Sequence, residues 1–360
     1  MNFSSRILRS AAGLLAATGL VACGGAAPSP QPSAGVGSGT LTGAGATFPE
    51  PFYTKAFYAY NQKYPQVTVN YQAVGSGAGI QQYTKGTVDF GASDVPMTDA
   101  ELATAGGADS LIEIPTILGV VAVAYNLSSV SNLNLDGPTL AGIYLGNIKK
   151  WNDPAIAALN SGARLPSTNI TVVHRSDGSG TTYAFTDYLA KISPDWKAKV
   201  GTAKSVQWPA GIGGSGNQGV GQAVQQTEGA IGYVELAYVV QANLKAAALK
   251  NANGKFVKPS PEGATAAASN NSNPSPTNFS ITNEPGDTTY PIASFSWLIM
   301  KRAQTDANKG KALAHLFTWL VGDGQSNGTS LQYAALPKNA KSYALDQLKL
   351  VTVNGAAVLS

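Results

Sequence analysis

The sequence is poor in charge. Only 12% of its 360 residues are Asp, Glu, Lys or Arg, about half of the roughly 25% found in ordinary soluble domains. The formal net charge is +4, and it falls to +2 if Arg6 and Arg9 belong to a removed segment. No block of like charges stands out, so we predict no nucleic-acid partner. An anion would have to bind at a local site rather than in a broad positive field.

One cysteine and two histidines restrict the chemistry that the chain can carry out. Cys23 has no partner for an intramolecular disulfide. His174 and His315 are too few for a His-rich metal centre, and no EF-hand ligand run is present. A carboxylate metal site stays open at this point, but we predict no metal and no cofactor.

A signature of nucleotide-hydrolysing enzymes is also missing, because the sequence has no Walker A pattern. Residues 211–216 match Gly-x-Gly-x-x-Gly by letter, but they follow Trp208-Pro209-Ala210 rather than a clean strand. We interpret them as a loop near a cleft and not as a dinucleotide site. The protein is therefore predicted not to be an enzyme.

The N-terminal 39 residues have the composition of an export signal and a tether. Basic residues precede an apolar stretch, 11–22, that is too short to span a bilayer as a permanent helix. The exit Leu20-Val21-Ala22-Cys23-Gly24 resembles the lipobox of bacterial lipoproteins, in which the cysteine is acylated; a plain signal peptide is the alternative. We predict a lipoprotein signal peptide (1–22), lipidation at Cys23 and a flexible tether (23–39). The protein would be anchored outside the cytoplasmic membrane, in a periplasm or at a cell surface.

After the tether, strand-like and helix-like stretches alternate, which favours an α/β fold. We expect helices over 49–64 and 79–85 and strands over 67–71 and 88–91. Two apolar runs that each contain a proline, 111–125 and 290–300, resemble strands that cross between two lobes. Lobe I would then comprise residues 40–114 and 291–360, and lobe II residues 115–290. The stretch 259–288 is interpreted as a surface loop.

Three glycine-rich stretches each run into an expected helix: 43–48 (GAGATF), 75–79 (GSGAG) and 177–182 (DGSGTT). A helix start offers unpaired amides and a partial positive charge, and small residues let an anion approach the backbone. A single such stretch is a weak indication, since Ser and Thr are common N-caps. Arg175 and Asp177 stand at the third, where the arginine could bind an oxyanion and Asp177 could hold its guanidinium. An ordinary surface ion pair is the alternative.

Six stretches, taken in order, closely resemble the phosphate-binding proteins of phosphate ABC transporters, the PstS family. They are LTGAGATFPEPFY, VNYQAVGSGAG, TVDFGASDVPM, IYLGNIKKWNDPAI, HRSDGSGTTYAFTDYL and EGAIGYVELAY. The resemblance implies a type II periplasmic-binding-protein fold, with the ligand cleft between two lobes joined by two crossover strands. It also implies capture of inorganic phosphate and its delivery to a membrane permease for import. We further expect a monomer.

The resemblance assigns the ligand residues position by position. His174 and Gly77 depart from residues common in the family, but neither falls on an assigned position. The residues matched to phosphate binding are Thr47, Phe48, Ser76, Asp94, Arg175, Asp177, Ser179, Gly180 and Thr181.

Asp94 is the informative member of this set. A carboxylate facing an anion is repulsive unless the ligand donates a proton to it, which phosphate can do near neutral pH and sulfate cannot. On the residues alone, Asp94 could equally cap a helix near Thr98 or pair with a lysine. The alternatives to phosphate binding are a site for another oxyanion and, less favoured, a phosphate-ester hydrolase.

Overall fold

The computed structural model of the protein describes residues 35–359. The predicted signal peptide (1–22) and Cys23 lie outside the described residues, as does most of the predicted tether (23–39). Within the last residues of that tether, Val36 is 3% exposed and belongs to the main core cluster. Strand β1 begins at Gly39, so the fold includes the end of the segment that composition assigned to the tether.

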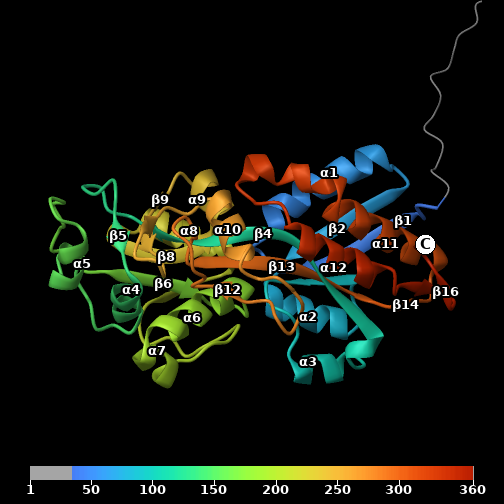
Figure 1. The fold of residues 1–360 in the computed structure, drawn as a ribbon, viewed down its shortest axis with the longest axis horizontal. Coiled ribbons are helices and arrows are strands. Elements are labelled where there is room, and N and C mark those ends of the chain that lie inside the picture. Colours follow the sequence, from blue (N-terminus) through green and yellow to red (C-terminus); the bar gives the residue numbers. More distant parts are fainter. Residues whose placement is uncertain (1–34, 360) are drawn as a thin grey trace, which may run out of the picture. The chain divides into compact units, whose positions relative to one another are not determined.

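One mixed sheet runs through the described chain (Figure 1). Its strands follow the order β2-β1-β3-β13-β4-β8-β6-β7, with β12 paired to β13 and β9 to β4. β1 is parallel to β2 and β3, and β6 is parallel to β7 and β8, whereas β13 and β4 are antiparallel to their neighbours. The strands are β1 (Gly39–Gly45), β2 (Val67–Ala73), β3 (Phe90–Ser93), β4 (Leu111–Tyr125), β6 (Thr171–Arg175), β7 (Ile212–Gly214), β8 (Ala230–Glu235), β9 (Lys245–Ala246), β12 (Ile281–Thr282) and β13 (Ile292–Lys301).

Two smaller sheets lie outside this one. They contain β5 (Asn134–Leu135), β10 (Ala248–Lys250) and β11 (Phe256–Val257) in the first, and β14 (Ala303–Gln304), β15 (Thr352–Val353) and β16 (Ala356–Ala357) in the second.

The long strand β4 joins the two halves of the main sheet. Its 15 residues are all buried; residues 111–120 pair with β13, and residues 121–125 pair with β8. Pro115 lies within it, and the register shifts so that Thr116 has no partner residue on β13. A bulge is the expected response to a proline, which cannot donate to the ladder. The two predicted crossover runs are therefore adjacent antiparallel strands in the middle of Figure 1.

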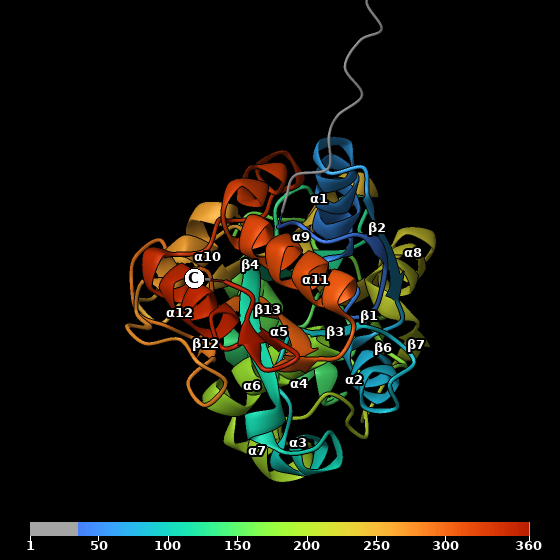
Figure 2. The same cartoon turned by 90° about the vertical axis from the view of Figure 1, so that its right-hand side faces the viewer.

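Helices cover the first half of the sheet, the end that carries β2, β1 and β3 (Figure 2). They are α1 (Glu50–Lys63), α2 (Ser76–Thr84), α3 (Asp99–Thr104), α11 (Ala307–Val321) and α12 (Lys338–Leu348). The helix expected over 49–64 is confirmed as α1. The helix expected over 79–85 begins three residues earlier, at Ser76, because Gly75 adopts a φ of 90° and caps it there. The expected strand at 88–91 is shifted to Phe90–Ser93.

The second half, with β8, β6 and β7, is covered by a further set of helices. They are α4 (Gly137–Tyr144), α5 (Pro154–Leu159), α6 (Gly180–Ile192), α7 (Pro194–Lys199), α8 (Gly216–Gln226), α9 (Leu236–Gln241) and α10 (Pro261–Ala268). The prediction of a surface loop over 259–288 is wrong for α10. Ser260 accepts a hydrogen bond from the Gly263 amide as N-cap, and Ala264 and Ala267 are buried against the sheet.

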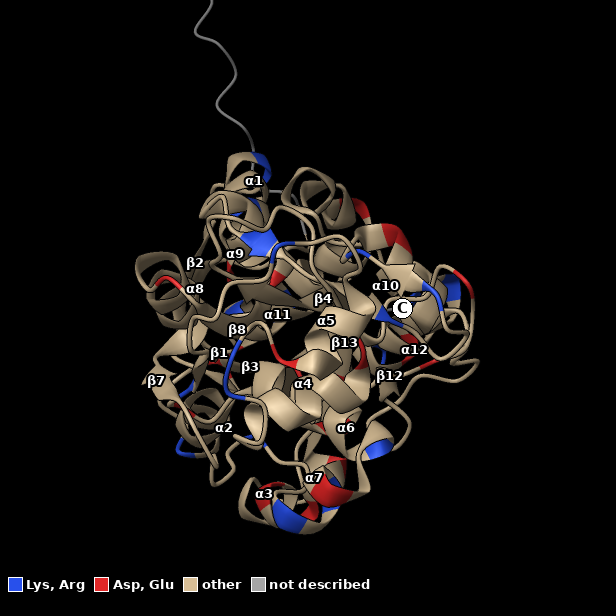
Figure 3. Ribbon diagram, turned by 90° about the vertical axis from the view of Figure 1, so that its left-hand side faces the viewer, with Lys and Arg blue, Asp and Glu red and all other residues tan. Residues whose placement is uncertain are grey.

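Figure 3 colours the charged residues and leaves most of the ribbon tan, as the low charged fraction requires. None of the helices in residues 35–359 combines the length and the hydropathy needed to cross a membrane. The predicted α/β class is confirmed by the mixed sheet and its covering helices.

Candidate functional site

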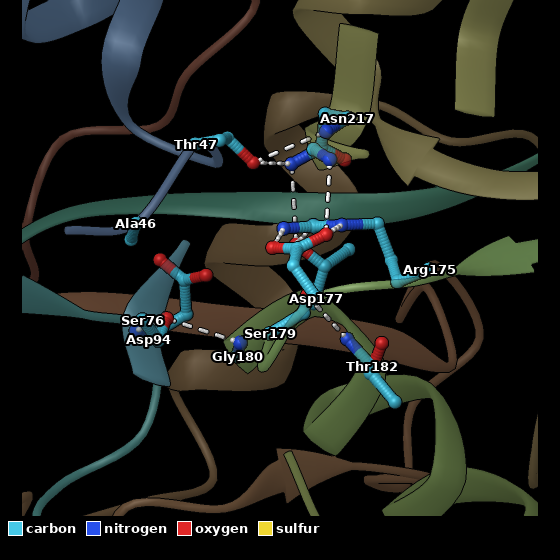
Figure 4. A network of polar contacts seen from close by, with 12 residues as sticks. Ala46, Thr47, Ser76, Asp94, Arg175, Asp177, Ser179, Gly180, Thr182 and Asn217 are labelled. Atoms are coloured by element: carbon cyan, nitrogen blue, oxygen red, sulfur yellow. Dashed lines mark hydrogen bonds and ion pairs between the residues drawn. The ribbon is translucent and has the colours of Figure 1, made fainter. Parts of the chain in front are cut away.

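The three predicted helix entries meet where the two halves of the sheet face each other (Figure 4). Thr47 follows β1, Ser76 follows β2 and Ser179 follows β6. The parallel strands β1 to β3 run in the opposite direction to the parallel strands β6 to β8, and the two sets pair with successive parts of the β13–β4 unit. The carboxyl ends of the two sets therefore face each other, and the chain segments that leave them are brought together. The structure thus explains why stretches more than a hundred residues apart in sequence form one site.

A fourth helix entry completes the site, and the sequence reasoning missed it. Asn217 lies in the first turn of α8, directly after β7, and its side chain is fully buried. The stretch before it, residues 211–216, is not the predicted loop, because residues 212–214 form strand β7 and Gly216 begins helix α8. It does have the same pattern as the other three, with glycines and Ser215 ahead of a helix, and that signal could have identified it.

Asn217 contacts hydroxyl groups from both sides of the site. Its backbone N donates to Thr47 Oγ1 (3.1 Å), and its Nδ2 donates to Thr47 Oγ1 (2.9 Å) and to Thr181 Oγ1 (3.2 Å). Thr181 Oγ1 also accepts from Arg175 Nη1 (3.3 Å). Each of these two threonine hydroxyls is therefore an acceptor for two N–H groups.

Ser76 has the same arrangement. Its Oγ accepts from the backbone N of Asp94 (3.3 Å) and from the backbone N of Gly180 (3.0 Å). A hydroxyl group has one proton to donate. In Thr47, Thr181 and Ser76 alike, the accepted N–H groups leave that proton free to be donated to a bound oxyanion.

Arg175 is buried, with 3% of its surface exposed. Asp177 binds it in a bidentate pair, accepting from Nε (2.8 Å) and from Nη2. Burial opposes the ionisation of Asp177, but the hydrogen bonds and the charge of Arg175 outweigh it and lower the pKa of that carboxyl. The guanidinium of this ion pair is buried and the Asp177 side chain is 20% exposed, so the pair holds the guanidinium in place and is not the surface pair considered as the alternative.

Two of the five N–H groups of Arg175 have no acceptor among the described residues. They are one on Nη1 and one on Nη2, because each of these nitrogens uses only one of its two hydrogens. Planar, paired N–H groups of this kind match the geometry of two oxygens of an oxyanion.

Asp94 is a buried carboxyl at the end of β3. Its Oδ1 accepts from Ser296 Oγ (2.8 Å), and its Oδ2 has no hydrogen-bond partner among residues 35–359. Burial raises the pKa of Asp94 to about 7; the Ser296 hydrogen bond and the charge of Arg175 oppose this, and the charge of Asp177 adds to it. A Cβ atom on Gly180 would lie 2.7 Å from Oδ2, which places this oxygen against the start of α6.

Neither alternative role for Asp94 is found in the described chain. Helix α3 is capped by Thr98, which forms a capping box with Glu101. No lysine of the described residues bonds to Asp94.

The remaining assigned residues lie at the same place. Ser179 is the N-cap of α6, where its Oγ accepts from the Thr182 amide (3.0 Å). Phe48 is fully buried, and its carbonyl accepts from Tyr333 OH (2.6 Å), while the Thr47 carbonyl accepts from Tyr238 OH (2.6 Å). These two tyrosines hold the turn that precedes α1.

Direct contacts join the two sides of the site. The Gly77 amide donates to the Gly178 carbonyl (2.9 Å), and Lys204 Nζ lies 2.6 Å from both carboxylate oxygens of Glu101. The described structure is therefore a closed arrangement of the two sides.

The two histidines take part in packing. His174 stacks on Trp208 with ring centroids 4.8 Å apart, and His315 Nδ1 is hydrogen-bonded to Tyr60 OH at 2.8 Å. Within residues 35–359, no three His, Cys, Asp or Glu side chains are grouped as they would be around a metal ion.

The fold and the site define a two-lobed binding protein whose cleft presents hydroxyl, amide and guanidinium donors to an anion. A family model described as a PBP superfamily domain matches residues 30–323. The phosphate-binding protein PstS of Xylella fastidiosa is 46% identical over 83% of this chain and 82% of its own length. That of Pasteurella multocida is 46% identical over 83% of this chain and 87% of its own. The chain belongs to the PstS family of phosphate-binding proteins, as the six motifs predicted.

Solved structures resemble the fold. A high-affinity periplasmic phosphate-binding protein with bound phosphate superimposes with a TM-score of 0.67 at 23% identity, covering 85% of this chain and 92% of its own. The phosphate-binding protein from Stenotrophomonas maltophilia gives a TM-score of 0.66 at 20% identity, covering 86% of this chain and 94% of its own. The predicted two-lobed fold is confirmed.

Proposed function

We propose that this protein binds inorganic phosphate outside the cytoplasmic membrane and delivers it to the permease of an ABC transporter. One observation carries the proposal. The cleft gathers three hydroxyl protons, from Thr47, Ser76 and Thr181, and two N–H groups of Arg175, none of which has an acceptor among residues 35–359. Asp94 Oδ2 lies at the same site as an acceptor that receives no hydrogen bond from the described residues. Many donors and one acceptor suit an oxyanion that carries one proton.

The rival functions fit this set less well. A fully ionised sulfate would place an oxygen acceptor against the acceptor Asp94 Oδ2 in a buried site, at a cost of about 1–3 kcal/mol or more. A hydrolase would need a nucleophile next to a base, and His174 instead stacks on Trp208. Relatives of 46% identity are named for phosphate binding, which is not an enzymatic role.

The assigned ligand residues divide between two lobes, for which we propose the bounds 40–114 with 291–360 for lobe I and 115–290 for lobe II. The pairing of β4 first with β13 and then with β8 supports the division. Phosphate touching both lobes would stabilise the closed arrangement, with the segments near Pro115 and Pro291 as the hinge. Small-angle scattering should give a smaller radius of gyration with phosphate; equal radii would contradict closure.

We further propose that the protein is a monomer and that lipid on Cys23 anchors it to the membrane. The lipobox-like sequence of residues 20–24 supports the lipid anchor. Acyl chains on one residue would hold the protein near its permease. Mass spectrometry of the mature N-terminus should show an acylated cysteine, and an unmodified N-terminus would disprove the anchor.

Titration calorimetry tests the proposed function directly. The chain lacking residues 1–23 should bind one phosphate per molecule, and sulfate in large excess should leave the binding isotherm unchanged. Sulfate binding of similar strength would favour the oxyanion alternative. Turnover of a phosphomonoester would favour the hydrolase.

A further inference from the structure

We propose that Asn217 is a positioning residue of this site, which turns the hydroxyls of Thr47 and Thr181 into donors to phosphate. The inference rests on the proposed function. None of the six motifs that carry the family resemblance includes Asn217. Its role is read from its contacts, which reach one hydroxyl in each proposed lobe.

The orientation of the Asn217 amide is determined by a neighbour that can only donate. The backbone N–H of Glu235 lies 2.9 Å from Asn217 Oδ1. A backbone N–H cannot accept, so the oxygen of the carboxamide must face it and the NH2 group must face the two threonines. Asn217 is fully buried, so water does not offer it other partners.

This orientation decides what the threonine hydroxyls can do. Thr47 Oγ1 accepts two N–H groups of Asn217, and Thr181 Oγ1 accepts one from Asn217 and one from Arg175. With both lone pairs engaged, the one proton of each hydroxyl is left for another acceptor. Without Asn217, these hydroxyls could rotate to donate to nearby protein groups, and phosphate would have to reorient them.

The same contacts link donor orientation to closure. Thr47 belongs to proposed lobe I, whereas Asn217, Thr181 and Arg175 belong to proposed lobe II. The two bonds from Asn217 to Thr47 can form only when the lobes meet. Thr47 is therefore oriented as a donor in the closed arrangement, at the moment when phosphate is enclosed.

A role limited to folding is the alternative, since Asn217 lies in the first turn of α8 and bonds the Glu235 backbone. In that case, replacing Asn217 would lower the stability of the protein, and its effect on phosphate affinity would be the same with or without the Thr47 hydroxyl. A double-mutant cycle separates the two roles, because only residues that act through each other are non-additive.

The experiment measures phosphate affinity by titration calorimetry on the full chain and on Asn217→Ala, Thr47→Val and their combination. Each single change should weaken phosphate binding ~10-fold or more, as expected for hydrogen bonds to a charged group. The affinity loss of the double variant should be at least about fivefold smaller than the product of the two single losses. The reason is that, once the Thr47 hydroxyl is removed, Asn217 no longer has it to orient. Val replaces Thr with nearly the same shape, so packing around residue 47 is preserved.

A matched cycle provides the control. Thr186 is a buried threonine of α6 whose Oγ1 bonds the Thr182 carbonyl (2.8 Å) and does not contact Asn217. The effects of Thr186→Val and Asn217→Ala on phosphate affinity should multiply in the double variant, which indicates that the two residues act independently. If Asn217→Ala fails to fold in thermal unfolding, Asn217→Ser, which keeps one donor, takes its place in the cycle.

If the affinity loss of the Asn217 and Thr47 double variant equals the product of the two single losses, the inference is overturned and the proposed function stands. A wild-type chain that binds no phosphate would overturn the proposed function itself, and the inference with it.

Discussion

Asp94→Asn is expected to reduce the preference for phosphate over sulfate at least ~100-fold, because a site built to hydrogen-bond a ligand group rejects an analogue that lacks this group by roughly 10⁴-fold or more. In the native site, Asp94 Oδ2 is an acceptor with no protein partner among the described residues. Protonated phosphate can donate to it, and sulfate cannot. An asparagine amide can present N–H groups to either anion, so the penalty on sulfate disappears.

Competition between the two anions, measured by calorimetry in wild type and variant, checks this result. Glu113→Gln is the matched control, since Glu113 is another buried carboxyl whose pKa burial raises to about 7, and its Oε1 accepts from the Met97 amide. The control should leave selectivity unchanged. An Asp94→Asn protein with wild-type selectivity would rule out proton reading by Asp94.

The raised pKa of Asp94 also predicts how stability depends on pH. The carboxyl has a pKa of about 7 in the folded protein and about 3.9 in an unfolded chain. Between these values the folded state binds more protons than the unfolded state, so this group lowers stability as pH rises from about 4 to about 7. Without ligand, Asp94→Asn should therefore melt above wild type at pH 8, with the difference vanishing near pH 4. A difference independent of pH would contradict the assignment.

Arg175→Lys is expected to weaken phosphate binding about 100- to 1,000-fold, the loss of two hydrogen bonds to a charged group. Lysine keeps the positive charge but has neither the planar pair of N–H groups nor the reach to bind Asp177 at two points. Asp177 would then be a poorly paired carboxylate beside the anion site. The buried Arg175 provides both the paired N–H groups for phosphate and the two-point contact with Asp177.

Calorimetry of wild type and variant measures this loss, with thermal unfolding as the check on folding. Arg302→Lys serves as the control, because Arg302 bonds the Leu111 carbonyl (3.0 Å) and lies outside the site. Its phosphate affinity should equal that of wild type. If Arg175→Lys binds phosphate within a factor of about three of wild type, Arg175 does not hold the ligand.

Much of the site could be predicted from the sequence because its parts are local motifs. A glycine-rich turn that opens a helix is specified within six or seven residues, and Thr47, Ser76 and Ser179 all lie in such turns. The alternation of strands and helices likewise predicted the α/β class. Their convergence could not be predicted in this way, because it depends on two sets of parallel strands that run in opposite directions with their carboxyl ends facing each other.

The features that could not be predicted depend on partners far away in the chain. Asn217 bonds Thr47 across 170 residues, and Ser296 bonds Asp94 across 202. Helix α10 has a different explanation, because its Ser260 N-cap, its initial Pro261 and its alanines are local helix signals that the Ser-, Asn- and Pro-rich composition of residues 259–288 obscured. Val36 was placed in the tether because composition cannot show that a core lies beside it.

By itself, the sequence determined the family, the α/β class, and which hydroxyls and charges are available for an anion. Only the tertiary structure decided which groups of the site donate hydrogen bonds to a ligand and which accept them. The proton of each hydroxyl is directed by which N–H groups surround its oxygen, and the pKa of Asp94 is raised by burial under both halves of the sheet. Both depend on low-dielectric contacts between residues distant in sequence, which no local pattern encodes.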